Sequence, residues 1–592
     1  MNMPLKMFDF KKFDFKMFVK RPLSVAVLIN LFFLFVCLAF GRLRFGAIDD
    51  YFMAAVLTGA HGTDYNPHLL FVNALYGYLL LPLYHLLPKV GWYYIGEMAA
   101  VFVGFTTICY VLVRKLGCRW GALLSALFVA FFASDFYLVL QFTQFASLLS
   151  ASGMLSFAFA VSERSIKNLP LMVLGAVLLF WGSIMRWEAF LMGMPFFALG
   201  LLLQIKNCWK LKIPVLAIFA ATVVAAFYTH HWDRELYTTD EYKYYMAFQG
   251  PRAGLGDGSN YNQNAVYEDL EEVGKSGKDY HMTTSWLFYD TEVFSVDSLH
   301  AMLSMVGQYR DHVARGQIPA TLMGALKHSM QSPLFWIWLV FSLLLIWRKN
   351  LYALYPWISL SIILGLMAYL LGAGRLVYRV ESGFWLYATC LAVPFLQQIK
   401  VALPKKILYV TLAVIAVCNL AVYASSGEMV RDPSSGKMRT LELADDTTDY
   451  KQVFDFIGSN PAKMFLLSMN AYMRFSHHKM PPYLAEPIGS YRNTISFGYW
   501  TPYLPEITQA LQEYGVENPM RDVVHDNVIV LNEGNLCDYL QRHYYDSVAV
   551  DTLRSIGEMT FYKYRLVTAD SSKLAAGSAE YMAGSVAEGE HD

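Results

Sequence analysis

The feature that most constrains this chain is a series of long apolar runs that are almost free of charged residues. About 20 residues suffice for a helix to cross the hydrocarbon core of a membrane. Only 16% of the 592 residues are charged, against roughly 25% in soluble proteins. The sequence therefore predicts an α-helical polytopic membrane protein and excludes soluble and disordered classes. The eleven predicted spans are 22–41, 92–113, 120–137, 141–161, 168–185, 188–205, 213–229, 332–347, 351–373, 383–399 and 407–424.

Basic residues predict the orientation of these spans. Lys and Arg gather before the first run and in alternate short loops, and such loops face the cytoplasm. The N-terminus is then cytoplasmic, and residues 1–21 form an amphipathic leader on that face. If a further apolar stretch, 68–88, also crossed the membrane, every later loop would change sides and the excess of basic residues on the cytoplasmic side would be lost. We expect it to form a re-entrant or interfacial helix pair on the outer side.

Three regions are predicted to lie outside: the loops 42–91 and 230–331 of the membrane domain (22–424), and residues 425–570. The last region alternates helical and strand-like segments, which predicts a soluble extracytoplasmic α/β domain. Residues 571–592 have the composition of a disordered tail. With 47 Lys+Arg and 47 Asp+Glu, the chain has no general attraction for polyanions, so nucleic acid is not an expected partner.

An acidic pair, Asp49 and Asp50, directly follows the first span. Two adjacent carboxylates beside a membrane cost free energy unless they are hydrated, paired with a cation or used in the function of the protein. One reading is structural: Asp50 caps a helix and Asp49 is favoured by the helix dipole. The other is catalytic: one carboxylate acts as general base on an acceptor, while the other orients it or holds a divalent cation such as Mg²⁺ or Mn²⁺.

An acidic pair after the first span, a first outer loop with short membrane-parallel helices, about eleven spans and an outer C-terminal domain together resemble the GT-C superfamily of integral-membrane glycosyltransferases. That superfamily includes protein O-mannosyltransferases and bacterial aminoarabinose transferases. The large outer loop is also similar to uncharacterised bacterial members of the superfamily, through YKYYMAFQGPRAGLGD and KDYHMTTSWLFYDTEVFSVDSL. The positions that match are Arg252, Asp257, Asp279, Tyr280, Trp286 and Asp290.

The resemblance implies a polyprenyl-phosphate sugar donor, whose leaving phosphate needs a cationic partner. Arginine binds phosphate oxygens in a bidentate manner. Arg375 and Arg379 are four apart and would share a helix face, with Glu381 close behind; Arg186 and Glu188 lie at another outer turn. The alternatives are that these arginines reach lipid head groups, or that Arg186 and Glu188 pair with each other.

The function predicted from the resemblance is transfer of a sugar from the polyprenyl-phosphate donor to a lipid, glycan or protein acceptor, with inversion, at the outer face of a bacterial plasma (inner) membrane. Membrane lipids are then partners as well. A lipid-linked glycan polymerase or ligase fits the same features. A multispan transporter or flippase, and a scaffold presenting the C-terminal domain, are alternatives from other classes. A transporter would carry ionisable residues within its spans. In this sequence, Glu97 is the only charged residue in the apolar cores of the predicted spans.

Overall fold

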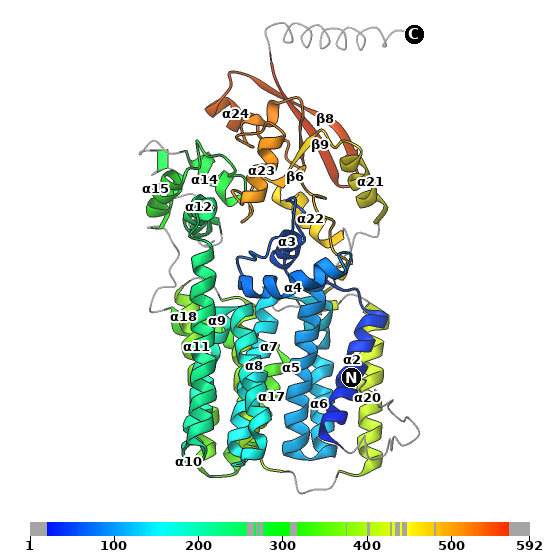
Figure 1. Cartoon of the computed structure of the whole chain (residues 1–592), viewed down its shortest axis with the longest axis vertical. Coiled ribbons are helices and arrows are strands. Elements are labelled where there is room, and N and C mark those ends of the chain that lie inside the picture. Colours follow the sequence, from blue (N-terminus) through cyan, green and yellow to red (C-terminus); the bar gives the residue numbers. More distant parts are fainter. Residues whose placement is uncertain are drawn as a thin grey trace, which may run out of the picture.

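A computed structural model describes residues 21–256, 266–267, 270–271, 276–307, 317–373, 376–398, 403–426, 429–431, 438–440, 447–478 and 481–567. Residues 1–20 of the predicted leader, Asp257, Arg375 and the predicted tail lie outside these ranges. The molecule is elongated, with a bundle of helices in its lower half and the C-terminal strands and outer loops above it (Figure 1). We call the end of the bundle nearest the C-terminal strands the upper end.

A helix lies at each predicted span. Within the described residues, six helices are long and apolar enough to cross a membrane, or seven if α16 (Ile318–Ser329) and α17 (Pro333–Trp347), which meet at a bend of 93°, form one span. The chain is thus a multi-pass helical protein, and the count of eleven spans stays a prediction. The bundle helices are α2 (Pro22–Phe40), α5 (Trp92–Leu116), α6 (Cys118–Ala133), α7 (Phe142–Ser162), α8 (Leu169–Met185), α9 (Trp187–Leu202), α11 (Lys212–Leu236), α17 (Pro333–Trp347), α18 (Tyr355–Gly372), α19 (Tyr378–Ala392) and α20 (Lys405–Ser426).

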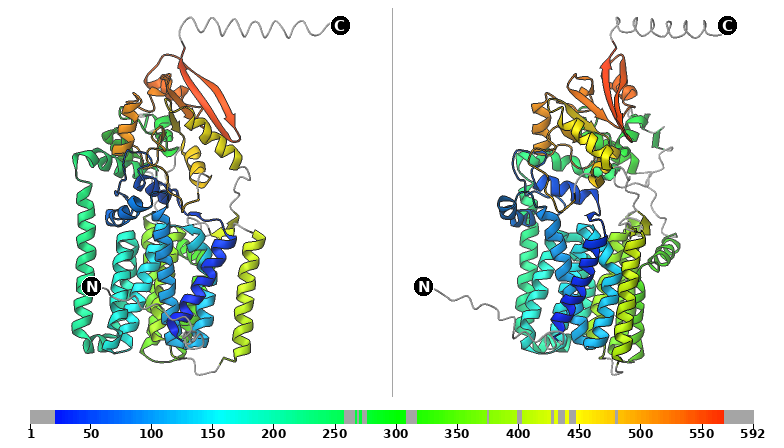
Figure 2. Two further views of the ribbon diagram at one scale, coloured as in Figure 1. Left: turned by 45° about the vertical axis from the view of Figure 1, so that its right-hand side comes forward. Right: turned by 90° about the vertical axis from the view of Figure 1, so that its right-hand side faces the viewer.

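The bundle has a central helix and a lipid-facing rim. Every residue of α7 from Phe142 to Val161 is buried, and this helix packs against α5, α8, α9 and α19. In contrast, α11 buries only Thr222 and Ala226, and it runs along one side of the bundle (Figure 2). Its exposed residues include Ile213 and Leu216. Apolar side chains in such a row are stable only against lipid or another apolar surface.

Two short helices lie across the upper end of the bundle, α3 (Ile48–Leu57) and α4 (Ala74–Leu86) (Figure 1). We expected a pair of helices at 68–88, but the structure has a single helix there. Residues 68–73 are not helical. Asn73 caps α4 by accepting a hydrogen bond from the Leu75 amide at 3.0 Å. With 13 residues, α4 is roughly 20 Å long, which is too short to cross the bilayer.

The C-terminal part holds a five-stranded mixed sheet in the order β6-β5-β7-β9-β8. Strand β5 pairs in parallel with both β6 and β7, whereas β9 pairs antiparallel with β7 and β8. The strands are β5 (Met464–Leu467), β6 (Thr494–Ser496), β7 (Val528–Leu531), β8 (Val548–Ile556) and β9 (Met559–Leu566), with helices α21 (Thr447–Gly458), α22 (Met469–His478), α23 (Pro505–Glu513) and α24 (Cys537–His543). The loop 230–331, which the sequence predicts to lie outside and which we call the large outer loop, contributes α12 (Asp240–Gly256), α14 (Gly277–Thr284) and α15 (Val296–Val306). These helices lie beside this part (Figure 1).

Candidate active site at the upper end of the bundle

A short parallel strand pair positions the acidic residues. Strand β1 (Arg44–Phe45), just after α2, pairs with β2 (Val139–Leu140), just before α7. Gly46 continues this pairing through a hydrogen bond from its amide to the Leu140 carbonyl, and an added Cβ would lie 2.9 Å from that oxygen. A side chain at this position would therefore push the strands apart. The pairing brings the first turn of α3 to the N-terminus of α7.

Neither aspartate caps α3. The N-cap is Ala47, which has no side chain able to accept a hydrogen bond, and both Asp49 and Asp50 lie in the first helical turn. They are well placed for the helix dipole, which favours negative charge there. Their carboxylates contact different parts of the molecule, and each is held by donors from distant segments.

Asp50 faces the bundle and is fully buried. Its Oδ1 accepts hydrogen bonds from the Tyr93 hydroxyl at 3.1 Å and from the Phe142 amide at 3.2 Å. The second donor belongs to the N-terminus of α7, where unpaired amides favour an anion. Burial, followed by the charge of Asp49, raises the pKa of Asp50 well above its usual value, and the hydrogen bonds oppose this rise only in part.

Glu97, on α5, is the buried neighbour of Asp50. It is fully buried, and both of its carboxyl oxygens and the Asp50 Oδ2 have no hydrogen-bond partner in the described part of the chain. A second buried carboxyl group near Asp50 disfavours the ionised form of both groups. Glu97, an ionisable residue inside a predicted span, therefore belongs to the acidic cluster at the upper end.

Asp49 faces the C-terminal part and is half-buried. Its Oδ1 accepts hydrogen bonds from the Trp500 indole at 3.0 Å and from the Tyr499 hydroxyl. The next helical residues support the same junction: the Phe52 ring stacks on Tyr472 with centroids 4.0 Å apart. Of the two aspartates, only Asp49 retains access for a substrate in this structure.

Arg186 joins the acidic pair through shared aromatic neighbours. Its guanidinium lies over the Phe142 ring at 5.4 Å and the Phe71 ring at 5.9 Å. Phe71 in turn contacts the Trp500 ring at 5.1 Å. Arg186 also forms an ion pair with Glu188 at 2.8 Å, and both side chains are partly exposed. The structure thus brings Arg186, Glu188 and Asp49 to one corner of the upper end.

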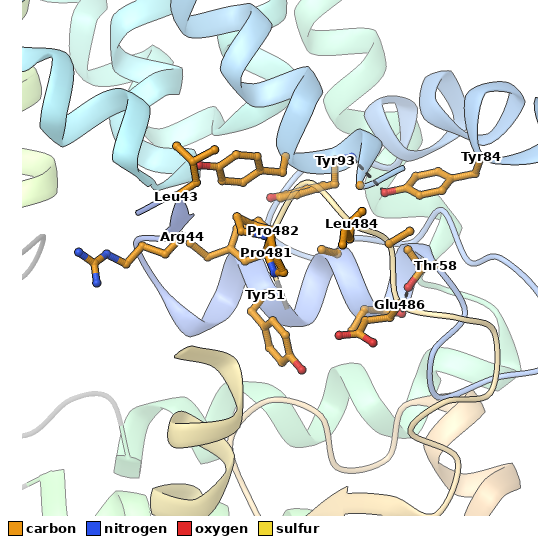
Figure 3. A pocket seen from close by; sticks show the side chains of 16 residues that line it. Leu43, Arg44, Tyr51, Thr58, Tyr84, Tyr93, Pro481, Pro482, Leu484 and Glu486 are labelled. Atoms are coloured by element: carbon orange, nitrogen blue, oxygen red, sulfur yellow. Dashed lines mark hydrogen bonds between the residues drawn. The ribbon is translucent and has the colours of Figure 1, made fainter. Parts of the chain in front are cut away.

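A small cavity lies on the other side of α3 (Figure 3). Tyr51, Tyr84, Tyr93 and Glu486 are among its lining residues, so it borders the tyrosine that holds Asp50. Its volume is about 40 Å³, which is room for a few water molecules and not for a sugar.

The second predicted arginine site is only partly described. Helix α19 begins at Tyr378, so Arg379 lies in its first turn, whereas Arg375 lies outside the described residues. Arg379 is half-buried at the start of α19, which packs against α7 and α9, the helices that begin at Phe142 and just after Arg186. Glu381 is buried and accepts a hydrogen bond from the Ser329 hydroxyl.

Two acids of the large outer loop serve as anchors to the C-terminal part. Asp290 is fully buried and accepts five hydrogen bonds, of which those from the Tyr539 and Tyr544 hydroxyls are 2.6 Å long. Asp279 is held by Arg542 at 2.7 Å and His543 at 3.1 Å. Carboxylates with this many protein donors have structural partners already, and neither lies beside Asp49.

Other residues of this loop pack closer to the acidic pair. The Trp286 ring contacts Tyr499 at 5.6 Å and lies under the Arg252 guanidinium, also at 5.6 Å. Arg252 is bonded to the Gln249 amide oxygen, while the Gln249 amide nitrogen donates to the Trp500 carbonyl at 3.2 Å. These residues support the two donors of Asp49. Tyr280 is buried in α14.

Several residues of this site carry no signal in the sequence that reveals their role. Tyr499 and Trp500 lie in an aromatic-rich segment, but nothing in that segment indicates a partner 450 residues earlier. Tyr93 and Phe142 are ordinary aromatic residues at span ends. Glu97, in contrast, was visible as a charge within a predicted span.

The residues of the acidic pair do not fit a shared cation. Asp49 and Asp50 bond to partners in the C-terminal part and in the bundle, respectively. Within the described ranges, no group of three or more His, Cys, Asp or Glu residues is close enough to hold a metal ion. We derive no catalytic step through a metal.

No protein-family model and no curated protein matches this sequence. Among solved structures, the chain is similar to ArnT from Cupriavidus metallidurans bound to undecaprenyl phosphate, with 11% identity and a TM-score of 0.37 over 91% of this chain and 97% of that one. It is also similar to the apo state of the same protein, with 10% identity and a TM-score of 0.40 over 91% and 96%. With TM-scores below 0.5 and identities of 10–11%, these similarities transfer no site residue and no function to this chain.

Proposed function

We propose that this chain is a membrane glycosyltransferase that moves a sugar from a polyprenyl-phosphate donor to an acceptor at the upper end of the bundle. The observation that carries the proposal is the junction at Asp49. A partly accessible carboxylate, held by the Trp500 indole at 3.0 Å, lies in the same aromatic cluster as an accessible arginine, Arg186. A base and a phosphate-binding cation are the two groups that this transfer requires.

In the proposed reaction, Asp49 accepts the proton of the acceptor hydroxyl as its oxygen forms a bond to the anomeric carbon. The bond from that carbon to the phosphate oxygen breaks, and polyprenyl phosphate leaves with the electron pair. A single displacement inverts the anomeric configuration. Arg186 stabilises the charge that develops on the leaving phosphate, and Arg379 and Arg375 are further candidates for this role.

Asp50 has a different role in this proposal. It is fully buried, so it does not meet the substrate, and its hydrogen bond to the Phe142 amide fixes the first turn of α3 against α7. It therefore positions its neighbour Asp49. Catalysis depends on such placement, because small displacements of a base cost large factors in rate.

The test follows release of polyprenyl phosphate from a panel of polyprenyl-phosphate sugars by the full chain in detergent, with and without EDTA. We expect Asp49→Asn to lower release by about 10²–10⁴-fold and Arg186→Gln by about 10²-fold. Asp50→Asn should cause a smaller loss than Asp49→Asn. The matched controls are Glu235→Gln and Arg234→Gln, exposed residues at the same end of the bundle.

If release persists in both Asp49→Asn and Arg186→Gln, the site lies elsewhere. If wild type releases nothing from any donor with any acceptor, the transporter and scaffold alternatives stand. Loss of release in EDTA, restored by Mg²⁺ or Mn²⁺, would establish a metal requirement that the described carboxylates do not explain.

A further inference from the structure

A second polar cavity lies at the lower end of the bundle, opposite the acidic pair. Its volume is about 480 Å³. Its walls come from the ends of α5, α7 and α17, from the turn after α9 and from residues 394–398. The positive-inside rule predicts that this end faces the cytoplasm.

The cavity concentrates positive charge. Four basic residues line it, against one acidic residue, Glu163. The helix dipole stabilises a cation at a helix C-terminus. This effect alone does not explain why cations from several segments line one cavity. A cavity with this excess of positive charge favours an anion. The basic residues are Arg114, Lys115, Arg164 and Arg348.

Two of these cations are already engaged by the protein. Arg348 donates a hydrogen bond to the Phe395 carbonyl. When the Gln397 amide is turned so that its oxygen faces the guanidinium, Arg348 also donates to that oxygen at 2.7 Å. Arg114 donates to Asn168 at 3.3 Å. Among the described residues, no hydrogen bond holds the ammonium of Lys115 or the guanidinium of Arg164. Their donors remain available to a ligand.

Gln204 provides an independent indication of a ligand. It lines the cavity and is only 2% exposed. Its amide nitrogen donates to the Gly200 carbonyl at 3.2 Å, but its Oε1 is buried without a hydrogen-bond partner in the described part of the chain. An unsatisfied buried acceptor costs about 1–3 kcal/mol. A ligand that carries a hydroxyl beside its phosphate would satisfy this oxygen.

The polar cavity continues into apolar space. A second cavity of about 350 Å³ shares Arg348, Leu396, Gln397 and Gln398 with it and is otherwise lined mostly by apolar side chains of α6 and α17. A third, of about 420 Å³, shares Leu124 and Phe341 with the second and is almost entirely apolar. The three together form a polar head site followed by an apolar groove along the helices.

We propose that these cavities bind one anionic phospholipid, with its phosphate between Lys115 and Arg164, a headgroup hydroxyl at Gln204 and an acyl chain in the groove between α6 and α17. Basic pockets between helices at the cytoplasmic face bind anionic lipid head groups in this way. The site is separate from the acidic pair and independent of the proposed reaction. The continuous groove favours a lipid over a soluble phosphate ester.

The test measures the melting temperature of the full chain in mixed micelles of constant ionic strength. Phosphatidylglycerol should raise the melting temperature of the wild type, whereas phosphatidylcholine and soluble glycerol 3-phosphate should not. The double variant Lys115→Gln/Arg164→Gln should lose at least half of this shift. The control Lys210→Gln, an exposed cation at the same end outside the cavity, should keep it.

Two further variants separate the lipid site from general charge attraction. Gln204→Leu removes no charge and should reduce the shift from phosphatidylglycerol, and Leu124→Trp should reduce it by filling the groove. Equal shifts in wild type and the double variant would overturn the proposal. A shift of the same size with glycerol 3-phosphate alone would also overturn it, because the ligand would then be a soluble ester.

Discussion

Ionisable side chains cluster at both the upper and the lower end of the helical bundle, but the two clusters differ in how far the protein satisfies their hydrogen bonds. At the upper end, Asp49 and Asp50 take hydrogen bonds from four residues that come from three distant segments of the chain. At the lower end, Lys115 and Arg164 face a cavity without a hydrogen bond in the described residues. The upper cluster is fixed before any ligand arrives, as catalysis requires, whereas the lower one is completed by a ligand.

The largest expected effect tests how strongly the upper end depends on contacts across the chain. Asp290→Ala leaves the buried Tyr539 and Tyr544 hydroxyls without their acceptor, so we expect a loss of about 3 kcal/mol or more in the free energy of unfolding. The control Asp297→Ala, exposed in the same loop, should change it by less than about 0.5 kcal/mol. Denaturant unfolding of the full chain measures both.

At the lower end, the comparison predicts a much smaller change. Gln204→Leu removes the unsatisfied buried oxygen together with the hydrogen bond to the Gly200 carbonyl, so without lipid the two effects oppose each other and the free energy of unfolding should change by less than about 1 kcal/mol. A loss as large as that of Asp290→Ala would show that the lower cavity is also a fixed network, and the contrast between the ends would fail.

The next effect concerns the donor to Asp49. Trp500→Phe keeps an aromatic ring against Phe71 but removes the indole hydrogen bond. A hydrogen bond to a charged group is worth about 1.5–3 kcal/mol, so we expect release of polyprenyl phosphate to fall by about tenfold or more. Trp232→Phe, at a half-buried tryptophan at the same end of the bundle that contacts Tyr78, is the matched control. Equal activities of the two variants would remove Trp500 from the positioning of Asp49.

A smaller effect concerns the buried carboxyl of Asp50. Its pKa is raised by burial, so the protonated form is favoured in the folded state. The stability that this proton supports is fully present below the ordinary value near 3.8 and is lost as the pH rises through the higher folded value. Asp50→Asn mimics the neutral form and should melt about 2 °C or more above wild type at neutral pH. Melting at a lower temperature would show that Asp50 is ionised and stabilising.

The sequence predicted much of the fold because the relevant signals are local. Apolar runs predicted the positions of the bundle helices, and the alternating helical and strand-like segments predicted that the C-terminal part holds both helices and strands. The site was predicted less completely. Asp49 and Asp50 were found from their place after a span, but the donors Tyr499 and Trp500 depend on folding over some 450 residues. The expected capping by Asp50 failed because α3 begins one turn earlier, with Ala47 as its N-cap.

The smallest effect lies where the C-terminal part meets the first outer loop. Glu506, at the start of α23, accepts a hydrogen bond from the Asn66 amide at 3.3 Å. Burial raises its pKa to about 7. The hydrogen bond from Asn66 opposes this rise, and the charge of Glu241 adds to it. The protonated carboxyl therefore contributes stability below the ordinary value of 4.5, and this contribution is lost as the pH rises through 7.

Glu506→Gln should flatten the fall in melting temperature between about pH 4.5 and 7, because the glutamine amide stays neutral throughout. The exposed Glu517→Gln should leave the slope as in wild type. The measurement is a series of melting curves across this range, in one detergent and at constant ionic strength. A wild-type curve that is flat here, or unchanged by Glu506→Gln, would show that Glu506 is ionised at the junction.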